Sequence, residues 1–522
     1  MPTKFVGNDF IDLHKDPDGR SAVVAAMAFG DAVEILDEQD GWLKLRALTV
    51  FDGDTEGWAD NSPPLSLRDE GIVKFSMVDV QQGDGMVLET PSGRIVLIDG
   101  GDNKLFARHV AARFLHLRPT PDTPLPVEAI VITHGDADHF DGLNDFLRSE
   151  TEPGIDTRKR VRLQPKRIYH NGLVKLPGTR PDGRTRPDLE MFGETADKDG
   201  IPHAVDLVDD PTELPDERMN LPFRRWVNTV RTWAARAPID IRRIAFGDDA
   251  DEVFDFLHDE DLRVEIQGPF PADVNGRPGL RFFRAPSRHA ELHLRSDEGS
   301  YSDSHTVNGH SIALRITYGA VRFNLSGDLN RPAMQLALKE LDAGDFEAEI
   351  VKAPHHGSGD FDFAALRATR PVVAIVSSGD ESAAKEHIHP RATLMAALGK
   401  VMRGDTGIIF NTELAAFFTT RDYAHRREDL RRYFSGRGNE AFTGDEVASL
   451  FSGRVDPGDP QPSYFSFERT NFGIIHIRTD GHRVLAFTHS GKKGVNEAYA
   501  FTVTMEADGS RTVAFLPEVD AR

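Results

Sequence analysis

Residues 133–142, THGDADHFDG, decide both the fold and the chemistry expected of this chain. They follow the apolar run of residues 127–132, VEAIVI, whose length and β-branched side chains predict a buried strand. Ligands at alternate positions of a tight loop can converge on one point, and a mixture of His and Asp suits zinc, manganese or iron. A polar surface turn is also rich in Asp and Gly, but four ligand-type residues within six positions favour a metal site. The four are His134, Asp136, Asp138 and His139.

Length and composition limit what kind of protein this is. A chain of 522 residues exceeds one ordinary core, so we expect two or more domains. No apolar run approaches membrane-spanning length and no signal-peptide pattern opens the chain, so we expect a cytoplasmic protein without membrane insertion. The absence of cysteine excludes disulfides and thiolate metal sites. The net charge of −22 argues against a chain that coats nucleic acid by its general charge, but it allows a local basic path.

Residues 1–66 have the pattern of a small all-β module. A Gly-Asp turn precedes the apolar segment 32–36, residues 41–46 alternate in period two, and Gly57-Trp58 follows a polar turn. This pattern resembles the bacterial SH3-like domain, a β-barrel that binds peptides, cell wall or a neighbouring domain. The resemblance implies a protein partner for this module. In the alternative interpretation, Trp42 and Trp58 simply fill the core of the barrel.

The main domain is expected over residues 71–403. Apolar strand patterns there alternate with helical ones, which predicts a layered α/β domain. The pattern degrades at about 150–305, which we interpret as an insertion. Residues 404–522 form a C-terminal extension whose segments 473–478 and 483–487 predict a terminal hairpin that adds to the sheet or covers the site.

Four further segments repeat the design of the opening motif, an apolar strand followed by ligand-type residues and a glycine or proline. Each of them contains His or Asp, as a binuclear site built from several strand ends requires. The segments are LIDGG at 97–101, LSGD at 325–328, APHHGS at 353–358 and HIHP at 387–390.

These segments resemble the metallo-β-lactamase superfamily, and specifically its ComEC-type branch, the hydrolase domain of DNA-internalisation proteins. The resemblance runs from about residue 72 to 400 and implies an αββα sandwich with metals at one edge of its two sheets. ComEC itself is a membrane protein, so a channel role does not carry over. The residues that carry the resemblance are DVQQGD at 79–84, LIDGG at 97–101, THGDADH at 133–139, SGD at 326–328 and HHGS at 355–358.

Residue by residue, the resemblance implies two divalent ions, zinc or manganese. His134 and Asp136 would bind the first ion, Asp138 and His139 the second, and Asp328 would bridge them. Many members carry a His at the position of Asp136, and the extra carboxylate makes manganese credible beside zinc. Two further sets of residues have alternative roles. The last His ligand is His355 or His356, with His389 as an alternative ligand or phosphate contact, and Asp99 and His310 are second-shell groups or possible ligands.

The expected chemistry is hydrolysis by a metal-activated water. Two cations lower the pKa of a bridging water and stabilise charge on a phosphoryl or acyl oxygen. Asp138 can orient that water and accept its proton, and His356 or His389 can donate a proton to the leaving group. No Gly-x-Ser-x-Gly pattern lies near these motifs, so water is the expected nucleophile.

The fold alone does not decide the substrate. The branch resemblance favours phosphodiesters, with DNA or RNA as the leading class. Residues 158–186 hold ten Lys or Arg and could bind a nucleic-acid backbone, or they form a solvated loop. The alternatives are a hydrolase of a small phosphoester or other ester, and a non-catalytic scaffold with a structural metal. An open basic groove would favour a polymer and a capped pocket a small molecule. The expected substrate-binding residues are Arg158, Lys159, Arg160, Lys166 and Arg167.

Overall fold

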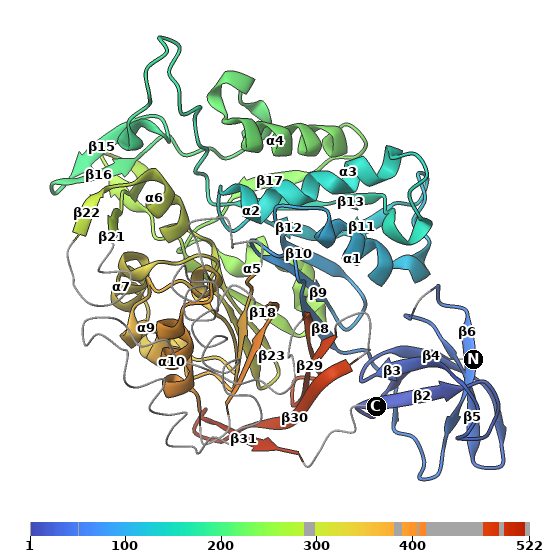
Figure 1. Cartoon of the computed structure of the whole chain (residues 1–522). Helices are drawn as coiled ribbons and strands as arrows, with labels where there is room; N and C mark the ends of the chain where they lie inside the picture. Colours follow the sequence, from blue (N-terminus) through green and yellow to red (C-terminus); the bar gives the residue numbers. More distant parts are fainter. Residues whose placement is uncertain are drawn as a thin grey trace, which may run out of the picture.

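The computed structural model describes residues 2–50, 52–286, 298–379, 389–403, 407–413, 473–489 and 495–516. Two large sheets pack face to face, and helices cover both outer faces (Figure 1). The mixed α/β fold predicted from the sequence is therefore confirmed. No helix within these ranges is both long enough and apolar enough to cross a membrane.

The first sheet has ten strands. Its middle strands are buried on both faces, which explains their nearly continuous apolar sequences. β10, β12, β14 and β17 run parallel, and the remaining neighbours are antiparallel. In spatial order the strands are β17 (Asp240–Arg243), β14 (Arg167–His170), β12 (Ala129–Val131), β10 (Ile95–Asp99), β9 (Gly85–Glu89), β8 (Val73–Met77), β28 (Ile474–Thr479), β29 (Arg483–His489), β30 (Val495–Met505) and β31 (Arg511–Phe515).

The second sheet has six strands. Its apolar inner face meets that of the first sheet in one continuous core, with Phe75 against Phe323 at its centre. In spatial order the strands are β18 (Leu262–Gly268), β23 (Ala313–Tyr318), β24 (Val321–Leu325), β25 (Ile350–Lys352), β26 (Val373–Val376) and β27 (Ile408–Asn411).

Separate helical cores seal the two outer faces. On the first sheet, Phe106, Phe146 and Trp226 belong to one buried cluster beneath the helices. On the second, Met334, Leu366 and Leu394 do the same. The helices are α1 (Leu105–Arg113), α3 (Asn144–Thr151) and α4 (Leu221–Ala234) on the first sheet, and α7 (Arg331–Glu340), α9 (Phe363–Thr369) and α10 (Ala392–Val401) on the second.

The segment expected to be an insertion is largely part of the sandwich. It supplies β14 and β17 to the first sheet, β18 to the second and the covering helix α4. These strands are hard to recognise in the sequence because β14 and β17 have four residues each, several of them charged. A small sheet of β15 (Thr195–Lys198), β16 (Ile201–Ala204), β20 (Arg277–Arg281) and β19 (Ala272–Val274) extends outside the sandwich.

The segments expected to form a terminal hairpin are β28 and β29, which pair with each other, and β30 and β31 continue the sheet beyond them. β28 also pairs with β8, so these strands add to the first sheet. Arg478 on β28 donates to the carbonyl of Phe29 at 2.8 Å and pairs with Asp31 at 2.9 Å, so the hairpin also holds the N-terminal module. Residues 414–472 of the predicted extension lie outside the described residues.

The N-terminal module is one antiparallel seven-stranded sheet. Leu43, Leu45 and Ala59 point into its core. Trp42 and Trp58 lie half-buried on the opposite face of β5 and β6, so the interpretation that they fill the core is wrong. In spatial order the strands are β3 (Val23–Ala28), β2 (Phe10–His14), β6 (Thr55–Asp60), β5 (Trp42–Ala47), β4 (Ala32–Gln39), β1 (Lys4–Val6) and β7 (Leu67–Arg68).

Candidate metal centre

The metal-competent side chains follow the carboxyl ends of strands in both sheets. In the first sheet, β10 ends in Asp99 and β12 leads into the loop of residues 133–139. In the second sheet, β24 leads to Asp328 and the parallel strand β25 to His355 and His356. Parallel strands end at the same edge of a sheet, so the two sheets bring these loops together.

Asp328 lies at the centre of the cluster. Its Oδ2 lies 3.0 Å from His356 Nε2, 3.4 Å from His139 Nε2 and 3.8 Å from His355 Nε2. Four groups of three residues among those described each bring their ligand atoms within 4.8 Å of one another, and two of the groups contain Asp328. The four are His134, His139 and Asp328; Asp84, Asp328 and His356; Asp138, His139 and His356; and Asp84, Asp99 and His139.

Three histidines have a polar neighbour at Nδ1. His139 Nδ1 lies 2.8 Å from Asp99 Oδ2, at hydrogen-bond distance, whereas His356 Nδ1 lies 3.3 Å from Asp84 Oδ1 without the alignment of a hydrogen bond. His134 Nδ1 lies 3.1 Å from the hydroxyl of Thr133 and 3.3 Å from that of Ser311. These contacts leave the Nε2 atoms for the centre of the cluster, which is the usual outer-shell arrangement of metal-binding imidazoles.

Unsatisfied nitrogen atoms show that these residues fit a metal. The Nε2 atoms of His139 and His356 are buried and make no hydrogen bond, although buried polar atoms nearly always do. Burial by itself lowers the pKa of both imidazoles, but Asp328 reverses this and raises the pKa of His356 to about 9 and that of His139 well above its ordinary value. The cluster therefore stabilises positive charge, as a site for a divalent cation must.

The turn at His355 and His356 places the two rings differently. Both residues adopt left-handed backbone angles, with φ of 45° and 51°, which is uncommon outside glycine and concentrated at functional sites. The His356 side chain is 3% exposed and lies inside the cluster, whereas that of His355 is 23% exposed and faces the pocket. His356 is thus the better placed ligand of the two.

Asp84 and Lys352 complete the cluster, although no role was predicted for either. Lys352 Nζ lies 2.5 Å from Asp84 Oδ2 and 3.4 Å from Asp328 Oδ1, and it donates to the carbonyl of Gly327 at 2.7 Å. Burial raises the pKa of Asp84, but Lys352 and His356 outweigh it and hold that pKa at about 2. The sequence held one signal for Lys352: it is a lysine at the end of an apolar strand, directly before the motif at 353–358.

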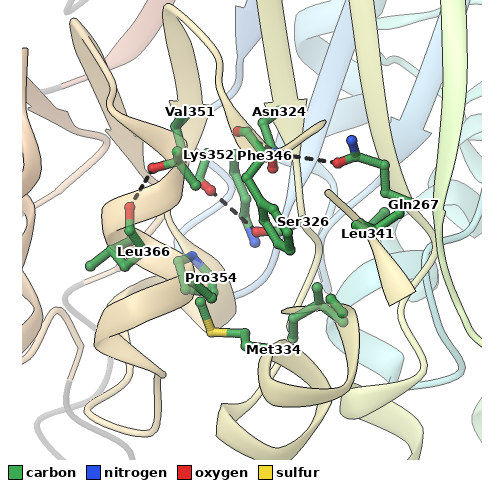
Figure 2. Close-up of a pocket in the computed structure, with 15 residues that line it drawn as sticks. Gln267, Asn324, Ser326, Met334, Leu341, Phe346, Val351, Lys352, Pro354 and Leu366 are labelled. Atoms are coloured by element: carbon green, nitrogen blue, oxygen red, sulfur yellow. Dashed lines mark hydrogen bonds between the residues drawn. The ribbon is translucent and has the colours of Figure 1, made fainter. Parts of the chain in front are cut away.

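Behind Lys352 the interior holds a void of about 30 Å³, shown in Figure 2 between Ser326, Lys352, Pro354 and Met334. Its polar wall is occupied, because Asn324 donates to Gln267 Oε1 at 3.2 Å and Ser326 donates to the carbonyl of Lys352 at 3.3 Å. A volume of this size holds about one water molecule. This void is therefore too small for a substrate.

Asp136 does not join the close groups. Its Oδ1 lies 2.8 Å from Lys175 Nζ, and Lys175 also pairs with Asp303 at 3.5 Å. The side-chain amide of Asn308 satisfies its hydrogen-bonding groups when its nitrogen faces Asp136. In that orientation the Asn308 side-chain nitrogen donates to Asp136 Oδ2 at 2.8 Å. Lys175 is the one member of the predicted basic stretch that the structure brings to the site.

The remaining histidines lie at different distances from the cluster. His389 lines the pocket, with its ring centroid 5.6 Å from that of His355. His310 lies outside the cluster, because its Nε2 is 2.8 Å from the carbonyl of Arg281 and its ring packs on Phe283. Burial lowers the pKa of His310 to about 4.

The five basic residues expected to hold substrate are not at the site. Lys166 and Arg167 pair with Glu128 at the amino end of β14. Because β14 runs parallel to β12, its amino end lies at the edge opposite the metal loop. Arg158 and Lys159 lie in the short helix η3 (Thr157–Lys159) beside α1, and Arg160 donates to the carbonyl of Glu152. The expectation failed because a run of basic residues in the sequence does not show at which end of a strand, and so at which edge of the sheet, those residues lie.

A pocket of about 380 Å³ opens over the cluster. Asp138, Asp328, His355 and His356 form its floor. Its wall includes α6 (Asp303–Gly309) and carries one arginine, Arg391. Gly83 lies against the metal loop, because a Cβ there would lie 1.7 Å from the carbonyl oxygen of Asp138, and its neighbour Gln82 lines the pocket and donates to Asp138 Oδ2 at 3.2 Å. The site thus combines metal-competent groups with a partly open pocket of a size that suits a small substrate.

The family model of the metallo-beta-lactamase superfamily matches residues 78–222, which include Asp84, Asp99 and the metal loop. The chain therefore contains a metallo-β-lactamase domain. A search of curated proteins found no significant match.

Three solved structures are similar at low identity. A diphosphatase from the PhnP family is 13% identical over 60% of this chain and 92% of its own, with a TM-score of 0.22. Unliganded yeast PDE1 is 10% identical over 65% and 97%, with a TM-score of 0.28. A long form RNase Z from yeast is 8% identical over 85% and 61%, with a TM-score of 0.26. TM-scores this low do not establish a shared fold, so the assignment rests on the family match and the site.

Proposed function

We propose that this chain is a metal-dependent hydrolase that cleaves phosphodiesters with water. The observation that carries the proposal is the convergence of His139, His355 and His356 on one oxygen of Asp328, on the floor of a pocket. Carboxylates and imidazoles in this proportion suit zinc and manganese.

The metal residues divide into two sets around Asp328. Asp138, His139 and His356 would hold one divalent ion, and His134 with His355 the other. Bound there, the ions would lower the pKa of a water and stabilise charge on phosphoryl oxygens. Asp138, held by Gln82, would orient the attacking water and accept its proton. This proposal makes ligands of both His355 and His356, whereas the sequence left the choice between them open and offered His356 as a proton donor.

The pocket favours a substrate of nucleotide size. A volume of about 380 Å³ suits a small molecule, and the five basic residues expected to bind a polymer lie elsewhere. Nucleic acid is the second candidate, favoured by the ComEC-type motifs at 79–84 and 355–358. In that case one end of the nucleic-acid strand would enter the pocket. The N-terminal module, if SH3-like in function as well as pattern, would recruit a protein partner through the face of Trp42 and Trp58.

A substrate panel tests the reaction class. The wild-type protein, stripped of metal and reloaded with Zn²⁺ or Mn²⁺, is offered bis-p-nitrophenyl phosphate, a dinucleotide, labelled DNA and RNA, a thioester and a lactone. We expect turnover of the phosphodiesters, with the small ones cleaved faster than the polymers. Turnover of the thioester or lactone alone would contradict the proposal. Faster cleavage of polymers would select the second candidate.

A further inference from the structure

His305 and Asp360 form a pair on the wall of the pocket, outside the metal cluster. His305 lies on α6, and Asp360 follows the turn of His355 and His356. His305 Nε2 lies 3.2 Å from Asp360 Oδ2, and the two side chains are 11% and 6% exposed. Both residues nevertheless line the pocket. The pair is therefore mostly buried, yet it can contact a substrate bound in the pocket.

The two nitrogens of His305 have different surroundings. Nε2 is buried and faces Asp360, without the alignment of a hydrogen bond. Catalytic pairs often tighten only when substrate is in place. Nδ1 has no hydrogen-bond partner among the described residues and is not one of the buried unpaired atoms, so it is accessible. A carboxylate behind one nitrogen and access at the other is the arrangement that holds an imidazole for proton transfer.

The backbone of His305 is fixed from both sides. Its N–H donates to the hydroxyl of Ser302 at 3.3 Å, and its carbonyl accepts from Asn330 Nδ2 at 2.7 Å. One helical turn along α6, an amide atom of Asn308 lies 3.3 Å from His355 Nε2 on the pocket floor. Residues three apart on a helix share a face, so His305 stands beside the cluster without being part of it.

We propose that His305 donates the proton to the leaving alcohol and that Asp360 positions its ring and stabilises the imidazolium. This inference rests on the phosphodiesterase function proposed above. Water forms the new bond to phosphorus while the bond from phosphorus to the leaving oxygen breaks. That oxygen keeps the electron pair and takes the proton from His305, and the proton lost by the water passes to Asp138. Exchange with solvent then restores both groups.

His305 is better placed for this role than the donors expected from the sequence. His356 has Asp84 at one nitrogen and Asp328 at the other, so both nitrogens face carboxylates within the cluster. His389 stands next to His355, which the proposed function assigns to a metal ion, with ring centroids 5.6 Å apart. The pair of His305 and Asp360 has its carboxylate outside the cluster.

Leaving-group dependence tests the proposal. Thymidine 5′-p-nitrophenyl phosphate and thymidine 5′-phenyl phosphate differ in the basicity of the phenolate that leaves. The nitrophenolate departs readily without a proton, whereas the phenolate is a stronger base and needs one. We expect His305→Asn to lower kcat on the phenyl ester by about tenfold or more beyond its effect on the nitrophenyl ester. Asp360→Asn should show the same preference to a smaller degree, in kcat rather than in KM.

The chain contains a matched control. His258 and Asp251 also form a His–Asp pair, at 3.8 Å, but their side chains are 55% and 75% exposed and away from the pocket. His258→Asn should leave both rates unchanged, and the melting temperature of each variant verifies folding, with His305→Gln as a second variant. Equal losses on both esters, or none, would overturn the role of His305 and leave the phosphodiesterase function standing. If the wild-type protein cleaves neither ester, the proposed function itself fails.

Discussion

Lys352 Nζ lies 2.5 Å from Asp84 Oδ2, and neither side chain is exposed to solvent. The pair joins the two sheets, because Asp84 precedes β9 and Lys352 ends β25. Asp84 also contacts His356 Nδ1, and Lys352 also contacts Asp328. One buried ion pair thus positions two members of the metal centre.

Removing Lys352 alone should be costly. Lys352→Met leaves the Asp84 carboxylate buried without its cation, and we expect the free energy of unfolding to fall by about 3–5 kcal/mol. Adding Asp84→Asn should recover part of that loss, because no unpaired charge remains. Urea denaturation of both single variants and the double variant measures this coupling. Additive losses would show that the two side chains do not interact.

Glu89 should make the protein sensitive to acid. It accepts from Lys74 at 2.7 Å and Arg113 at 2.8 Å, and these two cations outweigh burial and hold its pKa at about 2, below the ordinary 4.5. Burial lowers the pKa of Lys74 itself, so the acid dependence comes from Glu89. A depressed carboxyl pKa contributes stability that is complete above pH 4.5 and lost as the pH falls through 2.

Glu89→Gln measures that contribution. The variant should be less stable at neutral pH, yet lose less stability than wild type between pH 4.5 and pH 2. Urea midpoints across this range provide the comparison. Parallel decline of the two proteins would exclude Glu89 as the source.

Asp99 should tune metal binding without contacting the metal. Its Oδ2 lies 2.8 Å from His139 Nδ1 and accepts from the hydroxyl of Thr133 at 2.7 Å. Asp99→Asn keeps the shape but weakens the hold on the ring, so we expect metal affinity to fall by about 10- to 100-fold. Isothermal titration with Zn²⁺ measures it. An unchanged affinity would show that His139 is oriented by other contacts.

Metal should stabilise the fold. A ligand that binds the native state raises the melting temperature in proportion to its affinity, so chelation should lower the melting temperature and Zn²⁺ or Mn²⁺ should restore it. His356→Asn should blunt this response, whereas the exposed His258→Asn should not. A melting temperature indifferent to chelator would argue against a metal centre.

Much of the site was predictable because its residues follow strands in short, regular motifs. His134, His139 and Asp328 are examples, since each comes within a few residues of an apolar run. The parts that escaped prediction depend on partners distant in sequence. Asp136 is held by Lys175, 39 residues away, and Asp84 by Lys352 in the other sheet.

The choice between His355 and His356 needed backbone geometry. The two residues are adjacent and identical in type, and the left-handed turn through both leaves the His356 ring inside the cluster and the His355 ring facing the pocket. His305 was likewise not predicted, because its partner Asp360 becomes a neighbour only when α6 folds over the second sheet. Local sequence motifs therefore predict the residues at the centre of the site, whereas the residues of the pocket wall are brought there by tertiary packing and are not visible in such motifs.

The most direct measurement is the rate of bis-p-nitrophenyl phosphate hydrolysis by metal-loaded wild type and Asp328→Asn, with metal content determined on the same samples. The exposed Asp251→Asn serves as the control for the same substitution. The account predicts turnover that depends on Zn²⁺ or Mn²⁺, and a loss of bound metal and of about a hundredfold or more in rate for Asp328→Asn alone. Full activity and full metal content in Asp328→Asn would contradict the central place of Asp328.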